Sequence, residues 1–263
     1  MTINHGIGKA LHGRCRVMCL LALCAILVVF SCSKREKVVT DQDLYNKASN
    51  YINRKKYYQA GEVLDRLAQE FPESPLMAET RLKRADVHFR LKEFDQARAE
   101  YEQFLNLHPV HPQAPLARLR IAMTHFEEIL DIDRDQTSTI KALESFERFL
   151  KEYPQSDQTS EAREKIRACR ERLAENDRYV ARFYLKTGSY RAARGRLQKI
   201  WALYPEISWR DEVLFLLAET YKLEGMVDEA AYVLCTLKRT FPESPHIKGM
   251  TFSCQDMAPG ALP

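Results

Sequence analysis

Histidine pairs and short catalytic patterns are the first places to look for chemistry in this sequence. His108 and His111 are close enough to share a metal ion, but a proline follows each and no cysteine or acid stands nearby at ligand spacing. We therefore expect both rings to pack in a turn. The HExxH, GxSxG, GxGxxG and Walker-type patterns are absent from the sequence. We predict no catalytic residue, no metal site and no cofactor, and hence a protein that is not an enzyme.

The cysteine with the clearest chemistry is Cys32. Residues 17–30 are an unbroken run of 14 apolar residues, preceded by basic residues and followed by Ser31. This run is shorter than the roughly 20 residues that cross a bilayer, and it is typical of a secretory signal. The segment Val29–Cys32 resembles a bacterial lipobox, which implies a covalent lipid on Cys32, and Ser33 implies sorting to the outer membrane. An ordinary cleaved signal or an uncleaved anchor remains the alternative.

Three cysteines lie beyond Cys32, at Cys169, Cys235 and Cys254. They are far apart, odd in number and form no CxxC pair, so neither a zinc site nor a disulfide framework is indicated. We expect Cys169 and Cys235 to be small buried apolar residues. The sequence leaves open whether any two of the three form a disulfide.

The charge and glycine content restrict the function class. Lys and Arg number 40 against 36 Asp and Glu, and three of the surplus bases precede residue 32. Because the body is nearly neutral, no nucleic-acid partner is predicted. Only 9 glycines occur, which favours helices over a turn-rich β fold.

Five prolines reveal an internal repeat. Each follows an aromatic residue or histidine, and each has an alanine twelve residues before it; four of the five also have an alanine twelve residues earlier still, with Leu130 as the exception. Small residues at this spacing let two antiparallel helices cross closely, and proline ends the second helix. The repeat prolines are Pro72, Pro109, Pro154, Pro205 and Pro242. This pattern resembles the tetratricopeptide repeat and predicts an all-α solenoid of five helix–turn–helix repeats.

The third repeat is flanked by extra sequence. The prolines are 37, 45, 51 and 37 residues apart, so two intervals are long. The first excess is a polar loop at residues 131–137. The second, residues 159–187, has apolar residues at helical spacing, and we expect one long linking helix of about 40 Å. The alternative is two helices broken near Asn176–Asp177.

Several local motifs, together with the lipobox and the repeats, resemble the BamD family of lipoproteins from the outer-membrane β-barrel assembly complex. The motifs are Leu107–Pro112, Ala142–Phe149, Val180–Tyr184 and Gly188–Ala193. The resemblance covers roughly residues 29–245. It implies a protein on the periplasmic face of the outer membrane that binds the POTRA domains of a BamA-like barrel, together with other Bam lipoproteins, and receives unfolded outer-membrane proteins.

Repeat positions suggest which residues would carry these contacts. First-helix residues of stacked repeats line a groove, and in the first two repeats they are Tyr45, Ser49, Ile52, Asn53, Leu82, Asp86, Phe89 and Arg90. The apolar members could accept aromatic side chains of an extended segment, and Arg90 could meet a carboxylate. Ile52 and Leu82 could instead pack between repeats. Arg196 matches a basic position of the family and is our candidate for the barrel contact; the alternative is a solvated arginine.

The predicted organisation has six parts: a signal peptide at 1–31, an anchored linker at 32–40, repeats one and two at 41–112, repeat three and the start of the long helix at 113–176, repeats four and five at 177–245, and a flexible tail at 246–263. Two other functions remain open: a pilotin that guides a secretin, and a periplasmic scaffold of the cell envelope.

Overall fold

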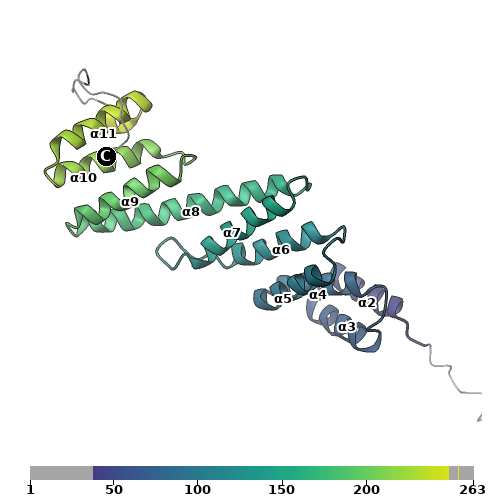
Figure 1. The fold of residues 1–263 in the computed structure, drawn as a ribbon. Coiled ribbons are helices and arrows are strands. Elements are labelled where there is room, and N and C mark those ends of the chain that lie inside the picture. Colours follow the sequence, from purple (N-terminus) through teal and green to yellow (C-terminus); the bar gives the residue numbers. More distant parts are fainter. Residues whose placement is uncertain (1–37, 249–253, 255–263) are drawn as a thin grey trace, which may run out of the picture. The chain divides into compact units, whose positions relative to one another are not determined.

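The computed structural model describes residues 38–248 and residue 254, and these residues form an all-helical chain. The signal peptide, Cys32 and most of the linker lie outside the described residues. Consecutive helices pack against each other as hairpins (Figure 1). The first helices of the five repeats are α2 (Asp41–Asn53), α4 (Met77–Arg90), α6 (Ala114–Glu127), α8 (Thr159–Lys186) and α10 (Arg210–Leu223). The second helices are α3 (Tyr57–Glu70), α5 (Phe94–Leu107), α7 (Thr137–Glu152), α9 (Tyr190–Leu203) and α11 (Val227–Thr240).

The second helix of each repeat ends two residues before its proline, and the residue between them is the C-cap. In the first repeat, the Phe71 amide donates to the Leu67 carbonyl at 2.9 Å, and Pro72 then has no amide with which to continue. The same terminal hydrogen bond is made by His108, Tyr153, Tyr204 and Phe241. The structure thereby confirms the predicted five-repeat solenoid.

The repeat alanines lie where helices cross. All nine are buried, from fully covered Ala60 to Ala230 at 7% exposure. Leu130, the exception, is 47% exposed because α6 ends at Glu127 and the position falls in the loop before α7. Close helix packing at small residues therefore accounts for both the rule and its exception.

Helix α8 is continuous for 28 residues, through Asn176 and Asp177. It packs against α7 of the third repeat and α9 of the fourth. Apolar residues recur along its whole length, so the single linking helix that we predicted is confirmed. None of the helices in residues 38–248 is long and apolar enough to cross a membrane.

The turn between the two helices of a repeat has the same backbone in four repeats. The residue 17 positions before the repeat proline has a positive φ: 57° at Lys55, 63° at Lys92, 73° at Gly188 and 78° at Gly225. The next amide then bonds back five residues, as from Lys56 to the Tyr51 carbonyl at 2.9 Å. The third repeat replaces this turn by a longer loop.

The structure answers the open question about the cysteines and corrects the start of the predicted tail. Cys235 is buried as expected, but it forms a disulfide with Cys254. Order also extends beyond residue 245, because Pro245–Ile247 form the 3₁₀ turn η1 and Ile247 is 9% exposed in the C-terminal core. The remaining predicted tail, residues 249–253 and 255–263, lies outside the described residues. Cys169 is buried and unbonded, and burial raises the pKa of its thiol to about 12.

Candidate functional site

The largest concentration of predicted site residues surrounds a hollow beside α2, α4 and α6, which we call the Arg90 hollow. Its volume is about 260 Å³. The lining comprises Ile52, Asn53, Lys55, Tyr57, Asp86, Val87, Phe89, Arg90 and Arg120. First helices of three successive repeats thus contribute to one concave site, as stacking of repeats requires.

Three cations and one acid give the Arg90 hollow a positive balance. The acid, Asp86, accepts a hydrogen bond from the Tyr101 hydroxyl at 2.5 Å, and Arg120 Nε lies 4.0 Å from the same carboxylate. Burial, followed by the charge of Asp86, raises the pKa of Tyr101, so this phenol remains a donor. Lys55 and Arg90 are exposed and make no ion pair with any residue in the described part of the chain.

Of the two aromatic residues that line the Arg90 hollow, Tyr57 and Phe89, Phe89 has its ring beside a cation. The Arg120 guanidinium carbon lies 5.8 Å from the centre of this ring, and Phe94 packs edge-on against it at 5.7 Å. An apolar ring beside exposed cations can accept an aromatic side chain and a carboxylate together.

A second hollow of about 120 Å³, the Tyr45 hollow, shares Asp86 with the first. Its other lining residues are Tyr45, Glu79, Leu82, Lys83, Tyr101, Gln113, Leu116 and Ala117. Lys83 Nζ lies 5.0 Å from the Tyr45 ring centre. Burial, followed by the charge of Glu79, raises the pKa of Tyr45. The shared carboxylate makes the two hollows neighbours along one surface.

The structure brings together seven of the eight predicted groove residues. Ser49 lines neither hollow, because its hydroxyl donates to the Tyr45 carbonyl at 2.9 Å within α2. Leu82 is 7% exposed and belongs to the core between α4, α5 and α6, so the packing alternative holds for it. Ile52 packs against the core formed by α2, α3 and Val87 of α4, and it also lines the Arg90 hollow.

Lys55, Lys83 and Arg120 line the hollows but were not predicted. Lys83 and Arg120 are 37 residues apart, the interval between the first two repeat prolines, so the repeat register could have revealed them together. Lys55 occupies the positive-φ turn position, which is Lys92 in the second repeat and glycine in the fourth and fifth.

Arg196, the predicted partner contact, lies in α9 and is tied within the chain. Its Nη1 is 2.6 Å from Oδ1 of Asp177 on α8, and Lys199 Nζ is 2.8 Å from Oδ2 of the same carboxylate. Asp177 is 1% exposed, whereas 39% of the Arg196 side chain remains accessible. The structure therefore gives Arg196 an internal ion pair and leaves part of its guanidinium exposed.

His108 and His111 pack in the turn after the second repeat, as predicted. Both rings lie against Phe104, with centres 5.4 and 5.2 Å away. The Gln113 amide donates to His111 Nδ1 at 3.1 Å. These contacts account for both rings without a ligand.

Comparison with known proteins agrees with the motifs. The family model described as outer membrane lipoprotein, YfiO, matches residues 37–237. Outer membrane protein assembly factor BamD of Caulobacter vibrioides is 28% identical, over 76% of this chain and 65% of that protein. The proteins of the same name from Neisseria meningitidis serogroup A and Vibrio cholerae are 28% and 26% identical, covering 86% and 80% of this chain and 90% and 92% of theirs. The matched span runs from α2 through most of α11, and the chain belongs to the YfiO, or BamD, family of outer membrane lipoproteins.

Proposed function

We propose that this protein is a non-enzymatic assembly factor for outer-membrane proteins, held on the periplasmic face of the outer membrane by a lipid on Cys32. Its N-terminal repeats receive segments of unfolded β-barrel proteins, and its C-terminal repeats bind the POTRA domains of a BamA-like barrel. The observation that carries the first contact is the Arg90 hollow, where Phe89 lies beside exposed cations. The family membership and the names of the relatives support the assembly role.

The Arg90 hollow suits the end of an extended chain. An aromatic side chain can pack on Phe89 and Ile52, while Lys55 and Arg90 lie free to pair with a terminal carboxylate. The Asp86 charge is already engaged by Tyr101 and Arg120, so it opposes an incoming anion less than a free carboxylate would. The Tyr45 hollow extends the site toward a second side chain.

Peptide binding tests this groove. A labelled peptide that ends in phenylalanine should bind, and both Arg90→Glu and amidation of the peptide end should weaken binding about tenfold, the cost of one charge-assisted hydrogen bond. Arg163→Glu is the matched control, because it makes the same charge change at an exposed position of α8. Equal affinity for free and amidated peptide would remove Arg90 from carboxylate recognition.

The C-terminal contact is tested by comparing two bases. Arg196 and Lys199 both pair with Asp177. Loss of barrel co-purification in Arg196→Glu but not in Lys199→Glu would support a direct contact of Arg196 with the partner. Equal losses would mean that the shared ion pair only positions α9, and no loss in either variant would remove this surface from the interface.

The anchor is tested in the signal segment. Cys32→Ala should release the protein from membranes, since stable attachment of a lipoprotein requires its acyl chains. Cys24→Ala, within the same apolar run, is the matched control and should remain membrane-bound. Unchanged membrane partitioning of Cys32→Ala would exclude the lipid anchor. Co-purification of a secretin in place of a POTRA-containing barrel would exclude the assembly role.

A further inference from the structure

One position on the second helix of each repeat faces the repeat that follows. It lies seven residues before the repeat proline, and in the first four repeats it is Asp65, Glu102, Glu147 and Gln198. Asp65 Oδ1 is 3.2 Å from Arg84 Nε on α4, and Gln198 Nε2 donates to the Tyr221 hydroxyl on α10 at 3.2 Å. Glu102 lines one cavity together with Arg118 of α6. In the first and fourth repeats, the side chain at this position therefore contacts the first helix of the next repeat.

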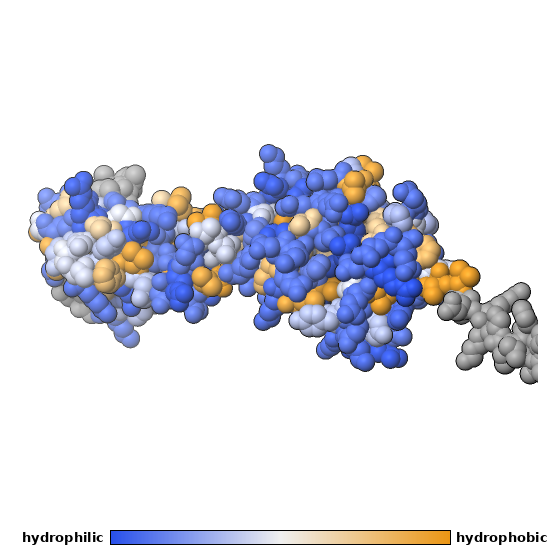
Figure 2. Space-filling model, turned by 90° about the horizontal axis from the view of Figure 1, so that it is seen from below, coloured by the Kyte–Doolittle hydropathy of each residue, from blue (hydrophilic) through white to orange (hydrophobic). Residues whose placement is uncertain are grey.

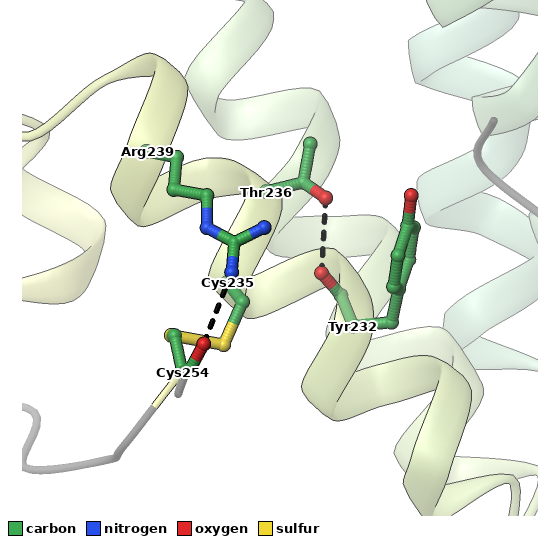
Figure 3. The surroundings of a disulfide bond; sticks show 5 residues. All are labelled: Tyr232, Cys235, Thr236, Arg239 and Cys254. Atoms are coloured by element: carbon green, nitrogen blue, oxygen red, sulfur yellow. Dashed lines mark hydrogen bonds between the residues drawn. A yellow bond between two sulfur atoms is a disulfide. The ribbon is translucent and has the colours of Figure 1, made fainter. Parts of the chain in front are cut away.

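In the fifth repeat this position is Cys235, and its contact is the disulfide to Cys254, with the two Cα atoms 5.6 Å apart (Figure 3). The first and fifth repeats end with the same five residues, Phe-Pro-Glu-Ser-Pro. Counted from those prolines, Cys254 falls twelve residues after Pro242, as Arg84 falls twelve residues after Pro72. Cys254 thus occupies the register position of Arg84, the residue by which α4 contacts α3.

The chain before Cys254 also begins as a further repeat would. Ser244 Oγ donates to Asp211 at 2.8 Å, and the corresponding Ser74 Oγ donates to Asp41 at 2.5 Å. After Ser74 the chain enters α4, and after Ser244 it forms η1. Ile247 of η1 is buried in the C-terminal core.

Two further contacts hold this segment on the last repeat. The His246 ring stacks on Phe215 of α10, with the ring centres 5.0 Å apart. Arg239 of α11 donates from Nη2 to the Cys254 carbonyl at 3.0 Å (Figure 3). Contacts from both helices of the fifth repeat thus flank the disulfide.

We propose that residues 245–248, together with Cys254, form the C-terminal cap of the solenoid and take the place of the first helix of a further repeat. The last repeat of a solenoid has an apolar face without a neighbour, and it needs a cap to remain soluble. Here the short turn η1 covers part of that face. The disulfide fixes the segment to α11, as the packing of a complete helix would otherwise do. The cap also prevents a helix of a second copy from docking on α10 and α11.

Hydrogen exchange of the full chain tests the cap. Cys254→Ser should speed amide exchange in α10 and α11 about tenfold or more, because the end of the solenoid then opens locally. Dithiothreitol should do the same to the wild-type protein, since it gives two electrons and two protons to the disulfide, leaves two thiols and closes its own ring. It should add nothing to Cys254→Ser.

Asp65→Ser is the matched control, because it removes the corresponding contact of the first repeat where a complete helix follows. Its effect on α3 should be small, since α4 is held there by buried Val87, with Met77 and Leu91 packed against the same core. Exchange in α2–α5 of Cys254→Ser serves as the internal reference for global folding.

A rise confined to α10 and α11 supports the cap, and unchanged exchange there after loss of the disulfide overturns it. An equal rise in α2–α5 would show general unfolding and would also contradict a local cap. Cys254→Ser should further self-associate as its concentration rises, measured by light scattering. A persistent monomer would overturn the claim that the cap blocks a second copy.

Discussion

The first two repeats and the last two use their basic side chains differently. Around the Arg90 hollow, Lys55 and Arg90 are exposed and form no ion pair with the residues that the structure describes. In the last repeats, Arg196 and Lys199 hold the buried Asp177, and the Arg210 guanidinium lies 3.8 Å from the centre of the Trp201 ring. Positive charge is thus available around the Arg90 hollow, whereas around Asp177 and Trp201 it is engaged within the chain.

The turns between the two helices of a repeat also differ between the first two repeats and the last two. Lysine occupies the positive-φ position in the first two repeats, whereas Gly188 and Gly225 occupy it in the last two. A side chain in the left-handed region costs roughly 1–2 kcal/mol, which glycine avoids. The C-terminal repeats therefore have the less strained turns, and the N-terminal repeats carry a charge there instead.

The hydropathy of the outer surface bears on how a partner could be bound. On the face shown in Figure 2, hydrophilic side chains predominate and apolar atoms appear only in small separate patches. This face therefore offers a partner no broad apolar patch.

The largest expected effect comes from removing the bases around Asp177. The double variant R196A/K199A should lose about 3 kcal/mol of unfolding free energy, because it leaves a buried carboxylate without a partner. K55A/R90A, which also removes two bases, should lose less than about 0.5 kcal/mol. Urea unfolding measures both, and equal losses would break the proposed contrast between the regions.

Replacing the glycines at the two positive-φ positions should give the next largest effect. Gly188→Ala and Gly225→Ala should each lower the unfolding free energy by about 1–2 kcal/mol. No atom lies within 4 Å of the added Cβ at either site, so the cost is backbone strain alone. Gly195→Ala, in α9 with equally open space and no positive φ, is the control and should be neutral or stabilising. A destabilised control would point to packing as the cause.

The two turns with lysine at the positive-φ position allow the reverse substitution, from lysine to glycine. Lys92→Gly should raise the unfolding free energy by about 0.5 kcal/mol, since relief of strain is partly offset by the greater freedom of glycine in the unfolded chain. Lys92 lines neither hollow, so peptide binding should not change. Lys55→Gly should give a similar gain in stability but weaken binding of a carboxylate-ended peptide. Weaker binding in both variants would mean that turn conformation, and not the Lys55 charge, governs the groove.

Much of the fold could be predicted because it depends on local rules. Proline ends a helix when it follows a run of helical residues, and alanine marks a close crossing, so Pro72 and Ala60 already locate the first hairpin. The continuity of α8 followed from apolar residues at helical spacing on both sides of Asn176. These rules act within one or two turns of helix and do not depend on partners elsewhere.

The groove and the C-terminal end were less predictable because they depend on how repeats stack. Arg120 reaches the Arg90 hollow from the third repeat, and Asp177 selects Arg196 and Lys199 from a neighbouring helix. The proximity of Cys235 and Cys254 likewise depends on how the chain folds back on the fifth repeat. No local pattern around either cysteine indicates this pairing, and only the register shared by the first and fifth repeats accounts for it.

The smallest expected effect lies in the third repeat, between the two regions compared above. Burial, followed by the charge of Arg98, lowers the pKa of His125, although Glu128 opposes this shift. The unfolded chain therefore binds a proton more readily, and stability should fall as the pH drops below about 6.5, the ordinary histidine pKa. Because the ring is only half-buried, we expect a loss of at most about 0.5 kcal/mol by pH 5.5.

His125→Gln should remove that part of the pH dependence, which urea unfolding at pH 5.5 and 7.5 would measure. His88→Gln is the control for the general effect of losing a histidine on a first helix. Because His125 lies outside both hollows, peptide binding by the N-terminal repeats should be unaffected by its loss. An unchanged pH dependence would show that His125 is protonated as readily in the folded chain as in the unfolded one. The third repeat would then respond to pH no differently from its neighbours, and the contrast between the two regions would rest on Asp177 and the turns alone.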